Sequence, residues 1–271
     1  RQHREARAAL QRELESNDDA QAEVLQALRD RIANHYQYTR ERVLFELLQN
    51  ADDASTELTR MRVEGGQPST PMAGTFVVRE DAERLVVLHW GRRINEWRVG
   101  DVDRRPSGYD RDLENMLLLS SSDKTEKALV TGRFGLGFKS VLLLTDRPQI
   151  VSGGICVQVR GGVLPTRLSA ADEESVHQEL ERWGPGSRDS GTAFALGSQD
   201  REARLRSIAV FDSVAAAQVA FTRSIRRIEL DHDGRRVSHS WPLDAGGSVE
   251  WGATGVGPDR DARYVLVPAG D

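Results

Sequence analysis

Three side chains on one predicted helix have types and spacing suited to joint chemistry. Glu46, Asn50 and Asp53 lie at positions i, i+4 and i+7 of the segment TRERVLFELLQNADDAST, residues 39–56, so they project from one helical face. A carboxylate can take a proton from water, and an amide offers an uncharged oxygen suited to a hard cation such as Mg²⁺. The alternative is an amphipathic helix whose polar side faces water. These three residues alone do not decide between the two.

A second candidate is the glycine-rich segment GRFGLGFKS, residues 132–140. Its three glycines allow the backbone to pass close to a ligand and to turn N–H groups toward an anion. It is not a Walker loop, because Phe138 and not Gly precedes Lys139, and it is not a Rossmann fingerprint, because Ser140 stands where the third Gly belongs. Taken alone, a glycine-rich turn of this kind is more often an ordinary loop than a phosphate-binding segment.

The lysines mark the same region. Only three of the 37 basic residues are lysine, namely Lys124, Lys127 and Lys139, and the other 34 are arginine. A lysine ammonium is a compact charge that suits a phosphate or a carboxylate. We therefore expect Lys124 or Lys139 to reach a phosphate, with a chance cluster on a solvated loop as the alternative.

The elements that position these residues follow from local patterns. Apolar residues at helical spacing predict a helix over 39–56, and further helices are expected in 1–34 with a break at 16–19, and in 111–122, 171–184 and 201–225. Alternating or β-branched runs predict hairpins in 75–90, 148–162 and 226–243, the last turned at Asp233-Gly234, and strands in 191–198 and 251–267. Residues 121–140 are expected to be loop, with a helix beginning between 140 and 145. The pattern indicates an α+β fold with one mixed, mostly antiparallel sheet and helices on one face.

Composition limits the classes of function. The chain has 271 residues, a formal charge of -5 and one cysteine, Cys156, which excludes a disulfide framework and a zinc site built on several thiolates. No apolar run approaches the roughly 20 residues needed to span a membrane, and no signal peptide opens the sequence. The acidic balance gives no support to nucleic-acid binding, although the cluster RSIRRIELDHDGRR, residues 223–236, is either a solvated edge or a basic surface. We expect a cytoplasmic protein with no membrane contact. Because the first residue is Arg1 and not Met, the sequence fits a piece of a longer chain.

Four motifs in order carry a resemblance to a known superfamily. Together they resemble the signature of the GHKL ATPases, most closely that of the chaperone-like and sacsin-like branch. In chain order, the motifs are FELLQNADDA, a hairpin that ends in HWG, the segment GRFGLGFKS, and GTAFAL. The resemblance covers roughly residues 36–200. It implies the Bergerat fold, a two-layer α/β sandwich, with an N-terminal helical extension over 1–35. Residues 201–271 would complete the sheet or lead to a following domain.

The resemblance also implies roles for particular residues. By similarity, Glu46 would be the catalytic base that activates water, and Asn50 would hold the Mg²⁺ that bridges the phosphates of ATP. The segment 132–137 would form a lid over the triphosphate, flanked by Phe138 and Lys139. The superfamily has no Walker lysine, so phosphate contact by Lys124 or Lys139 is inferred from the lysine count and not from the resemblance. With these two included, the residues assigned to ATP are Asn50, Asp53, Ala54, His89, Gly91, Lys124, Gly132, Arg133, Phe134, Gly135, Leu136, Gly137, Phe138, Lys139 and Thr192.

One position departs from the pattern of the superfamily. His89 stands where the superfamily usually has the aspartate that accepts a hydrogen bond from the adenine amine. A neutral imidazole can accept through its bare nitrogen but carries no charge, so adenine binding would be weaker or the choice of base different. The alternative is that His89 only ends a strand and that Asp101 or Asp103 takes the role.

The implied function is an ATP-driven switch. Lid closure over ATP and Mg²⁺ would drive self-association or movement of attached domains in a larger protein, and analogy with bacterial relatives adds a role in phage defence. A non-hydrolysing nucleotide sensor is the main alternative. A histidine-kinase domain fits less well, because no dimerisation hairpin with a phosphoacceptor histidine precedes the motif helix.

Overall fold

The computed structural model describes residues 12–66, 74–96, 112–117, 136–186, 188–198 and 200–241, single residues 5, 9 and 72, and three short strands near the C-terminus. Its helices are α2 (Asp18–Asp30), α3 (Val43–Glu64), α4 (Asp112–Leu117), α5 (Leu136–Lys139), α6 (Ala170–Trp183) and α7 (Arg201–Phe221). A π-helical turn (Arg31–His35) follows α2, and 3₁₀ turns precede α3 (Arg40–Arg42) and follow α5 (Ser140–Leu143). No helix within these residues is long and apolar enough to cross a bilayer.

The sheet confirms the predicted α+β class. Its strands are β1 (Thr75–Glu80), β2 (Arg84–His89), β3 (Gln149–Ser152), β4 (Ile155–Arg160), β5 (Leu164–Arg167), β6 (Thr192–Gly197), β7 (Arg227–His232), β8 (Arg235–Ser240) and β10 (Ala253–Gly255). They lie in the order β10-β8-β7-β1-β2-β6-β3-β4-β5, and a separate pair joins β9 (Val249–Glu250) to β11 (Val265–Leu266). All neighbours in the large sheet are antiparallel except β1 and β7, which are parallel. The sheet is thus mixed and mostly antiparallel, as expected.

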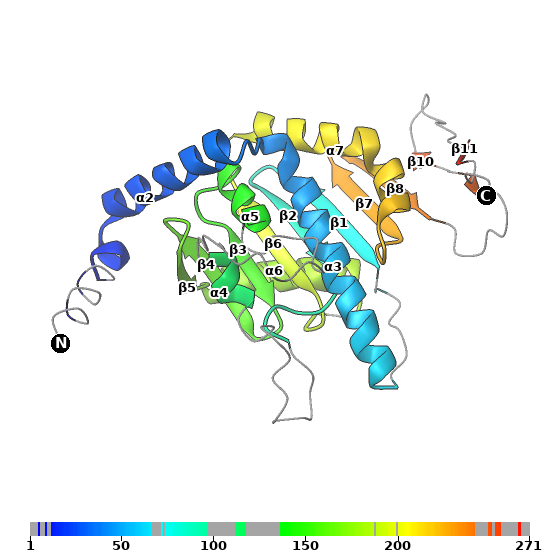
Figure 1. Ribbon diagram of the computed structural model, residues 1–271, viewed down its shortest axis with the longest axis horizontal. Coiled ribbons are helices and arrows are strands. Elements are labelled where there is room, and N and C mark those ends of the chain that lie inside the picture. The colour runs from blue at the N-terminus through cyan, green and yellow to red at the C-terminus, as the bar shows by residue number, and fades with distance from the viewer. Residues whose placement is uncertain are drawn as a thin grey trace.

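Two layers are formed by the sheet and the long helices α3 and α7, which run across it (Figure 1). On this face Phe76, Val78 and Phe194 of the strands pack with Leu47 of α3 and Phe211 of α7. Alternate residues of the same strands point to the other face, as strand geometry requires. The main core therefore lies between α3, α7 and one face of the sheet.

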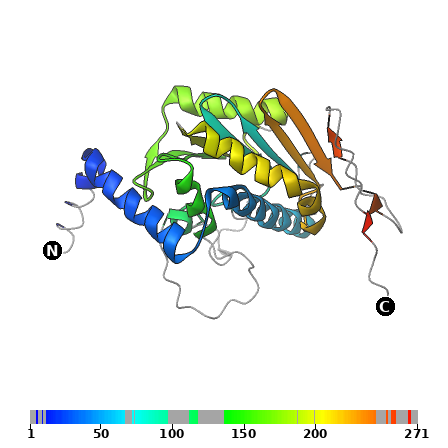
Figure 2. The same cartoon turned by 90° about the horizontal axis from the view of Figure 1, so that it is seen from above.

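Helix α6 departs from the expectation of helices on a single face. Its residues Val176 and Leu180 pack with Val77, Val86 and Leu88, which project from the opposite side of the sheet. Figure 2 shows α6, in lime, on one side of the strands and α3 and α7 on the other. Periodicity identifies which side of a helix is apolar but not which face of a sheet that side covers, so the placement of α6 is a tertiary property.

Local predictions hold at several positions. The hairpin β7–β8 turns at Asp233-Gly234, both with positive φ (54° and 72°), which is the two-residue turn that twisted strands prefer. The helix break at 16–19 is confirmed, because Asn17 caps α2 through its side chain. Residues 136–139 are helical, so the predicted loop ends earlier than expected and its following helix begins at Leu136 and not at 140.

The division into segments at 35/36 and 200/201 stays a prediction. Helix α2 packs Leu25, Leu28 and Ile32 against Leu142. Beyond residue 200, α7, β7, β8 and β10 belong to the same core and sheet as the preceding elements.

Candidate functional site

Helix α3 presents its polar motif over the ends of the central strands. Its apolar stripe, which includes Leu44, Leu47, Leu48 and Ala51, is buried in the main core and fixes the rotation of the helix. Glu46 and Asn50, one turn apart, are only partly buried. The helix therefore holds a carboxylate and an amide at the margin of the core, where solvent and a ligand can reach them.

Glu46 lies directly against the glycine-rich segment. A Cβ placed on Gly137 would come within 2.7 Å of Glu46 Oε2, so a side chain at position 137 would displace the carboxylate. Burial raises the pKa of Glu46 above its ordinary value, and Arg42, 3.7 Å away, together with a hydrogen bond from Tyr38 offsets part of that effect. A carboxylate with a raised pKa is a better proton acceptor than an exposed one.

Asn50 makes no hydrogen bond through its amide within the part of the chain that the structure describes. Its side chain is partly buried, and its oxygen is a suitable ligand for a hard cation. Ala54, one turn further on, contacts the chain where it leaves β2. A Cβ on Gly91 would come within 2.7 Å of Ala54 C and Ser55 N, and the Arg92 N–H donates to Ala54 O at 2.9 Å. Because position 91 is glycine, the chain that follows β2 can pack directly against the backbone of α3.

Asp53, which the resemblance places near the nucleotide, contacts the chain that follows α7. Its carboxylate forms an ion pair with Arg223, at the start of the turn between α7 and β7. Burial raises the pKa of Asp53, and the attraction of Arg223 offsets part of that effect. Its neighbour Asp52, which the sequence reasoning missed, accepts backbone N–H groups from Arg223, Ser224 and Ile225 at 2.9, 2.7 and 2.9 Å.

A row of polar side chains crosses the strand ends beneath α3. His89 of β2 pairs in register with Thr192 of β6, which pairs with Ser152 of β3. All three are buried, and the Ser152 and Thr192 hydroxyls lie 2.7 Å apart. The Ile94 N–H donates to Ser152 Oγ at 2.9 Å, so this serine also holds the loop after β2. The sequence predicted His89 and Thr192 but missed Ser152, although its two-residue offset from Ile150 puts both on one face of β3.

His89 is neutral in this setting. Complete burial, with a smaller effect from Arg92, lowers its pKa to about 4. The Gly91 N–H donates to Nδ1 at 3.2 Å, so the proton of the neutral ring belongs on Nε2. The nitrogen expected to accept a hydrogen bond from a base is therefore already occupied, and the ring presents a donor instead.

Arg92 fixes the loop after β2 and was not predicted. Its buried guanidinium donates to Glu57 of α3 at 2.6 Å and to Asp112 of α4 at 2.7 Å. Burial alone would lower the pKa of Arg92, but the hydrogen bonds and charges of these two carboxylates raise it. The pair of contacts joins α3 to α4 beside the strand ends.

The end of the glycine-rich segment lies in the core. Phe138 is buried, with its ring centroid 5.6 Å from that of Phe194. Lys139 is also buried, and its Nζ donates to the carbonyl oxygens of Met116 and Leu117, at 2.9 and 2.7 Å, at the C-terminal end of α4. Burial lowers the pKa of Lys139 to about 8. Lys139 was expected to reach a phosphate, but its ammonium instead binds the end of α4. Phe138 packs in the core.

Part of the predicted site lies outside the described residues. These positions are Lys124, Gly132, Arg133, Phe134 and Gly135, and of Leu136 only the backbone is described. A cavity of about 390 Å³ adjoins the strand ends between Leu58, Gly91 and Arg93. A larger cavity of about 1190 Å³ lies at the opposite strand ends, beside Arg84 and Gly197, and is separate from the motif residues.

A mixed sheet beneath a helix with this polar motif, with polar residues at the ends of neighbouring strands, defines the two-layer class that the GHKL resemblance implies. Comparison with known proteins agrees. The family described as "Sacsin domain" matches residues 108–160. Over 129 residues the chain is 28% identical to the chaperone protein HtpG of Nitratidesulfovibrio vulgaris, a match that covers 45% of this chain and 20% of that relative. Both matches support the chaperone-like and sacsin-like branch of the GHKL superfamily.

Proposed function

We propose that this chain is the ATP-binding and ATP-hydrolysing module of a chaperone-like GHKL ATPase. The observation that carries the proposal is the contact between Glu46 and Gly137, which joins two motifs that are distant in sequence. The similarity to the sacsin domain and to HtpG supports the same activity class. Glu46 is the general base in this proposal, because its partly buried carboxylate has a raised pKa and lies against Gly137, where the segment proposed to wrap phosphates ends.

Asn50 is the residue proposed to hold Mg²⁺. Its amide fits a hard cation, since it is partly buried and makes no hydrogen bond within the described chain. A bound Mg²⁺ would neutralise phosphate charge as the terminal phosphoryl group is transferred to water. The chain's own contribution is to hold the attacking water at Glu46 and to exclude bulk solvent from it.

The strand-end row is proposed to recognise the base. Thr192 and Ser152 supply hydroxyls, and His89 supplies an Nε2–H donor in place of the usual carboxylate acceptor. An adenine amine needs an acceptor there, whereas a purine with an oxygen at position 6 offers one. We therefore propose that His89 weakens selection for adenine.

The proposed switch follows the pattern of the superfamily. Closure of the segment around residues 132–137 over ATP would change the conformation of a larger protein or drive dimerisation, in the cytoplasm and, by analogy, in phage defence. These roles have the resemblance alone as support.

The first test measures Mg²⁺-dependent ATP binding and hydrolysis on the purified chain. Glu46→Gln should retain binding and lose about 10²-fold or more in turnover, because only the base is removed. Asn50→Ala should lose the Mg²⁺-dependent part of binding. Glu64→Gln, an exposed glutamate at the end of the same helix, is the matched control and should behave as wild type. Equal turnover in wild type and Glu46→Gln would rule out Glu46 as the base.

A non-hydrolysing nucleotide sensor is the second candidate, and the occupied Nδ1 of His89 favours it. Measuring the binding and turnover of ATP and GTP by wild type and by His89→Asp distinguishes the ATPase from the non-hydrolysing sensor. If His89→Asp raises ATP affinity and turnover, the site is an ATPase with relaxed base selection. If nucleotide binds tightly but neither protein turns it over, the sensor function holds.

A further inference from the structure

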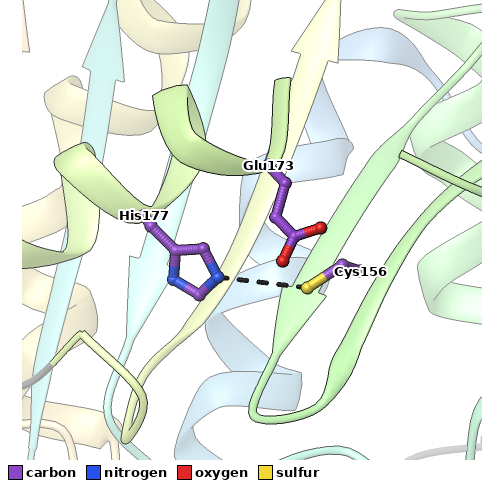
Figure 3. Close-up of side chains that lie close together, drawn as sticks. All are labelled: Cys156, Glu173 and His177. Atoms are coloured by element: carbon purple, nitrogen blue, oxygen red, sulfur yellow. Dashed lines mark hydrogen bonds between the residues drawn. The ribbon is translucent and has the colours of Figure 1, made fainter. Parts of the chain in front are cut away.

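Three side chains of metal-binding type converge on the sheet face opposite the candidate nucleotide site. Cys156 comes from β4, and Glu173 and His177 come from α6 (Figure 3). Their ligand atoms all lie within 4.8 Å of one another. The helix presents both of its residues to the same point, because positions i and i+4 share one helical face.

The elements that carry the cluster are firmly held. Ser169 caps α6, its Oγ accepting from the Asp172 N–H at 3.1 Å, and Val176 and Leu180 are fully buried against the sheet. Cys156 packs at the edge of the same apolar cluster. The three side chains therefore meet on rigid secondary structure and not on a loop.

Within the described chain, the His177 side chain has a single, weak hydrogen bond, to the sulfur of Cys156. It is only 5% exposed, its Nδ1 has no partner among the described residues, and its Nε2 lies 3.9 Å from Cys156 Sγ. A buried imidazole normally satisfies its nitrogens. Here Nε2 points at the sulfur, beside the Glu173 carboxylate, as Figure 3 shows.

The spacing is close to that of a coordinated ion. Tetrahedral zinc, with bonds of about 2.3 Å to sulfur and about 2.0 Å to nitrogen, places these two ligand atoms about 3.5 Å apart. The observed 3.9 Å needs only a small side-chain rotation. Cys156 and Glu173 are partly exposed, so water can supply a fourth ligand.

We propose that Cys156, Glu173 and His177 bind a zinc ion or another borderline-soft divalent cation between β4 and α6. One thiolate, one imidazole and one carboxylate form a ligand set that suits zinc and disfavours Mg²⁺. The site would cross-link α6 to the sheet and is separate from the nucleotide chemistry proposed above.

A cysteine nucleophile activated by His177 fits the same residues less well. The Glu173 carboxylate lies beside the sulfur, where it disfavours a thiolate that no cation stabilises. Nδ1 of His177, which an orienting acid would contact, has no partner among the described residues.

The test is a titration of the purified, metal-free 271-residue chain with Zn²⁺ and with Co²⁺. We expect one ion per chain and a thiolate-to-cobalt charge-transfer band. Because the sequence contains a single cysteine, that band identifies Cys156 without ambiguity. Cys156→Ser should abolish the band, and Glu173→Gln and His177→Gln should each weaken Zn²⁺ affinity at least about tenfold.

Matched controls make the outcome decisive. Glu174→Gln changes the adjacent, exposed glutamate and should bind Zn²⁺ as wild type does. Unfolding in the presence of a chelator establishes that each variant folds before metal is added. Absence of stoichiometric binding, absence of a thiolate band, or equal affinity in folded Cys156→Ser would overturn the proposal. ATP binding is measured separately, so its failure leaves this test intact.

Discussion

The two halves of the motif on α3 hold their polar groups in opposite states. In the first half, Asn50 makes no hydrogen bond within the described chain, and Glu46 faces Gly137 with only Arg42 and Tyr38 to offset its burial. In the second half, Asp52 accepts three backbone N–H groups and Asp53 pairs with Arg223. One helix thus presents groups that remain available to a ligand and groups that are used by the fold.

The difference shows why a motif cannot be read as a uniform set of ligands. A buried carboxylate with three hydrogen bonds gains stability from the folded chain. A partly buried group without such partners costs free energy unless something else binds it. Position along α3, and not residue type, decides which of the two applies.

The largest expected effect on stability belongs to Asp52→Ala. Removal of the carboxylate leaves the N–H groups of residues 223–225 without their acceptor, and we expect a loss of at least about 3 kcal/mol in the free energy of unfolding. Urea-induced unfolding followed by circular dichroism measures it.

Asp53→Ala is the matched neighbour. Arg223 is 55% exposed and can return to water, so we expect a loss below about 1 kcal/mol. Similar losses in the two variants would contradict the assignment of Asp52 as the anchor of the turn.

The same comparison applies at the end of β2, where His89 Nδ1 accepts a hydrogen bond from the Gly91 N–H and so is used by the fold. Its folded pKa of about 4 lies below the ordinary value of 6.5, so the unfolded chain binds a proton first as the pH falls. The free energy of unfolding should therefore decrease as the pH falls from about 6.5 to 4, and His89 should account for about 2 to 3 kcal/mol of that decrease.

His89→Asn isolates that contribution. The Asn oxygen can accept from the Gly91 N–H as Nδ1 does, but it does not titrate. The unfolding free energy of the variant should decline less than that of wild type over this pH range, with His35→Gln, at an exposed position, as the control. Parallel pH profiles for wild type and His89→Asn would show that His89 is not buried as a neutral ring.

Local sequence patterns anticipated much of this arrangement. The period of α3 predicted that Glu46 and Asn50 share a face, and the β-branched runs predicted β1 and β2 with His89 at the end. Those features depend on neighbours a few residues away. The sequence also contained a sign that Asp52 is buried, because position 52 continues the apolar stripe through Leu44 and Leu48. A carboxylate buried in that stripe requires hydrogen-bond partners.

Long-range packing was not accessible in the same way. The parallel pairing of β1 with β7 joins segments separated by more than half of the chain, and although a mixed sheet was expected, no pattern in the sequence indicated which strands would be parallel. The burial of Lys139 beneath α4 depends on the carbonyls of Met116 and Leu117 meeting it in space, which no spacing in the sequence encodes. The same holds for Arg92, whose partners come from α3 and α4.

The smallest expected change in stability comes from Glu46→Gln. Because burial raises its folded pKa above the unfolded value, Glu46 favours folding most in its protonated form, and that contribution is lost as the pH rises through the folded pKa. At pH 7 the amide removes the desolvation penalty of the carboxylate, so we expect unchanged or slightly higher stability, within about 0.5 kcal/mol. Urea unfolding at pH 7 and at pH 4.5 measures both values, and the advantage of the variant should shrink at the lower pH. A large loss at pH 7 would place Glu46 with Asp52 among the residues used by the fold and remove the contrast within α3.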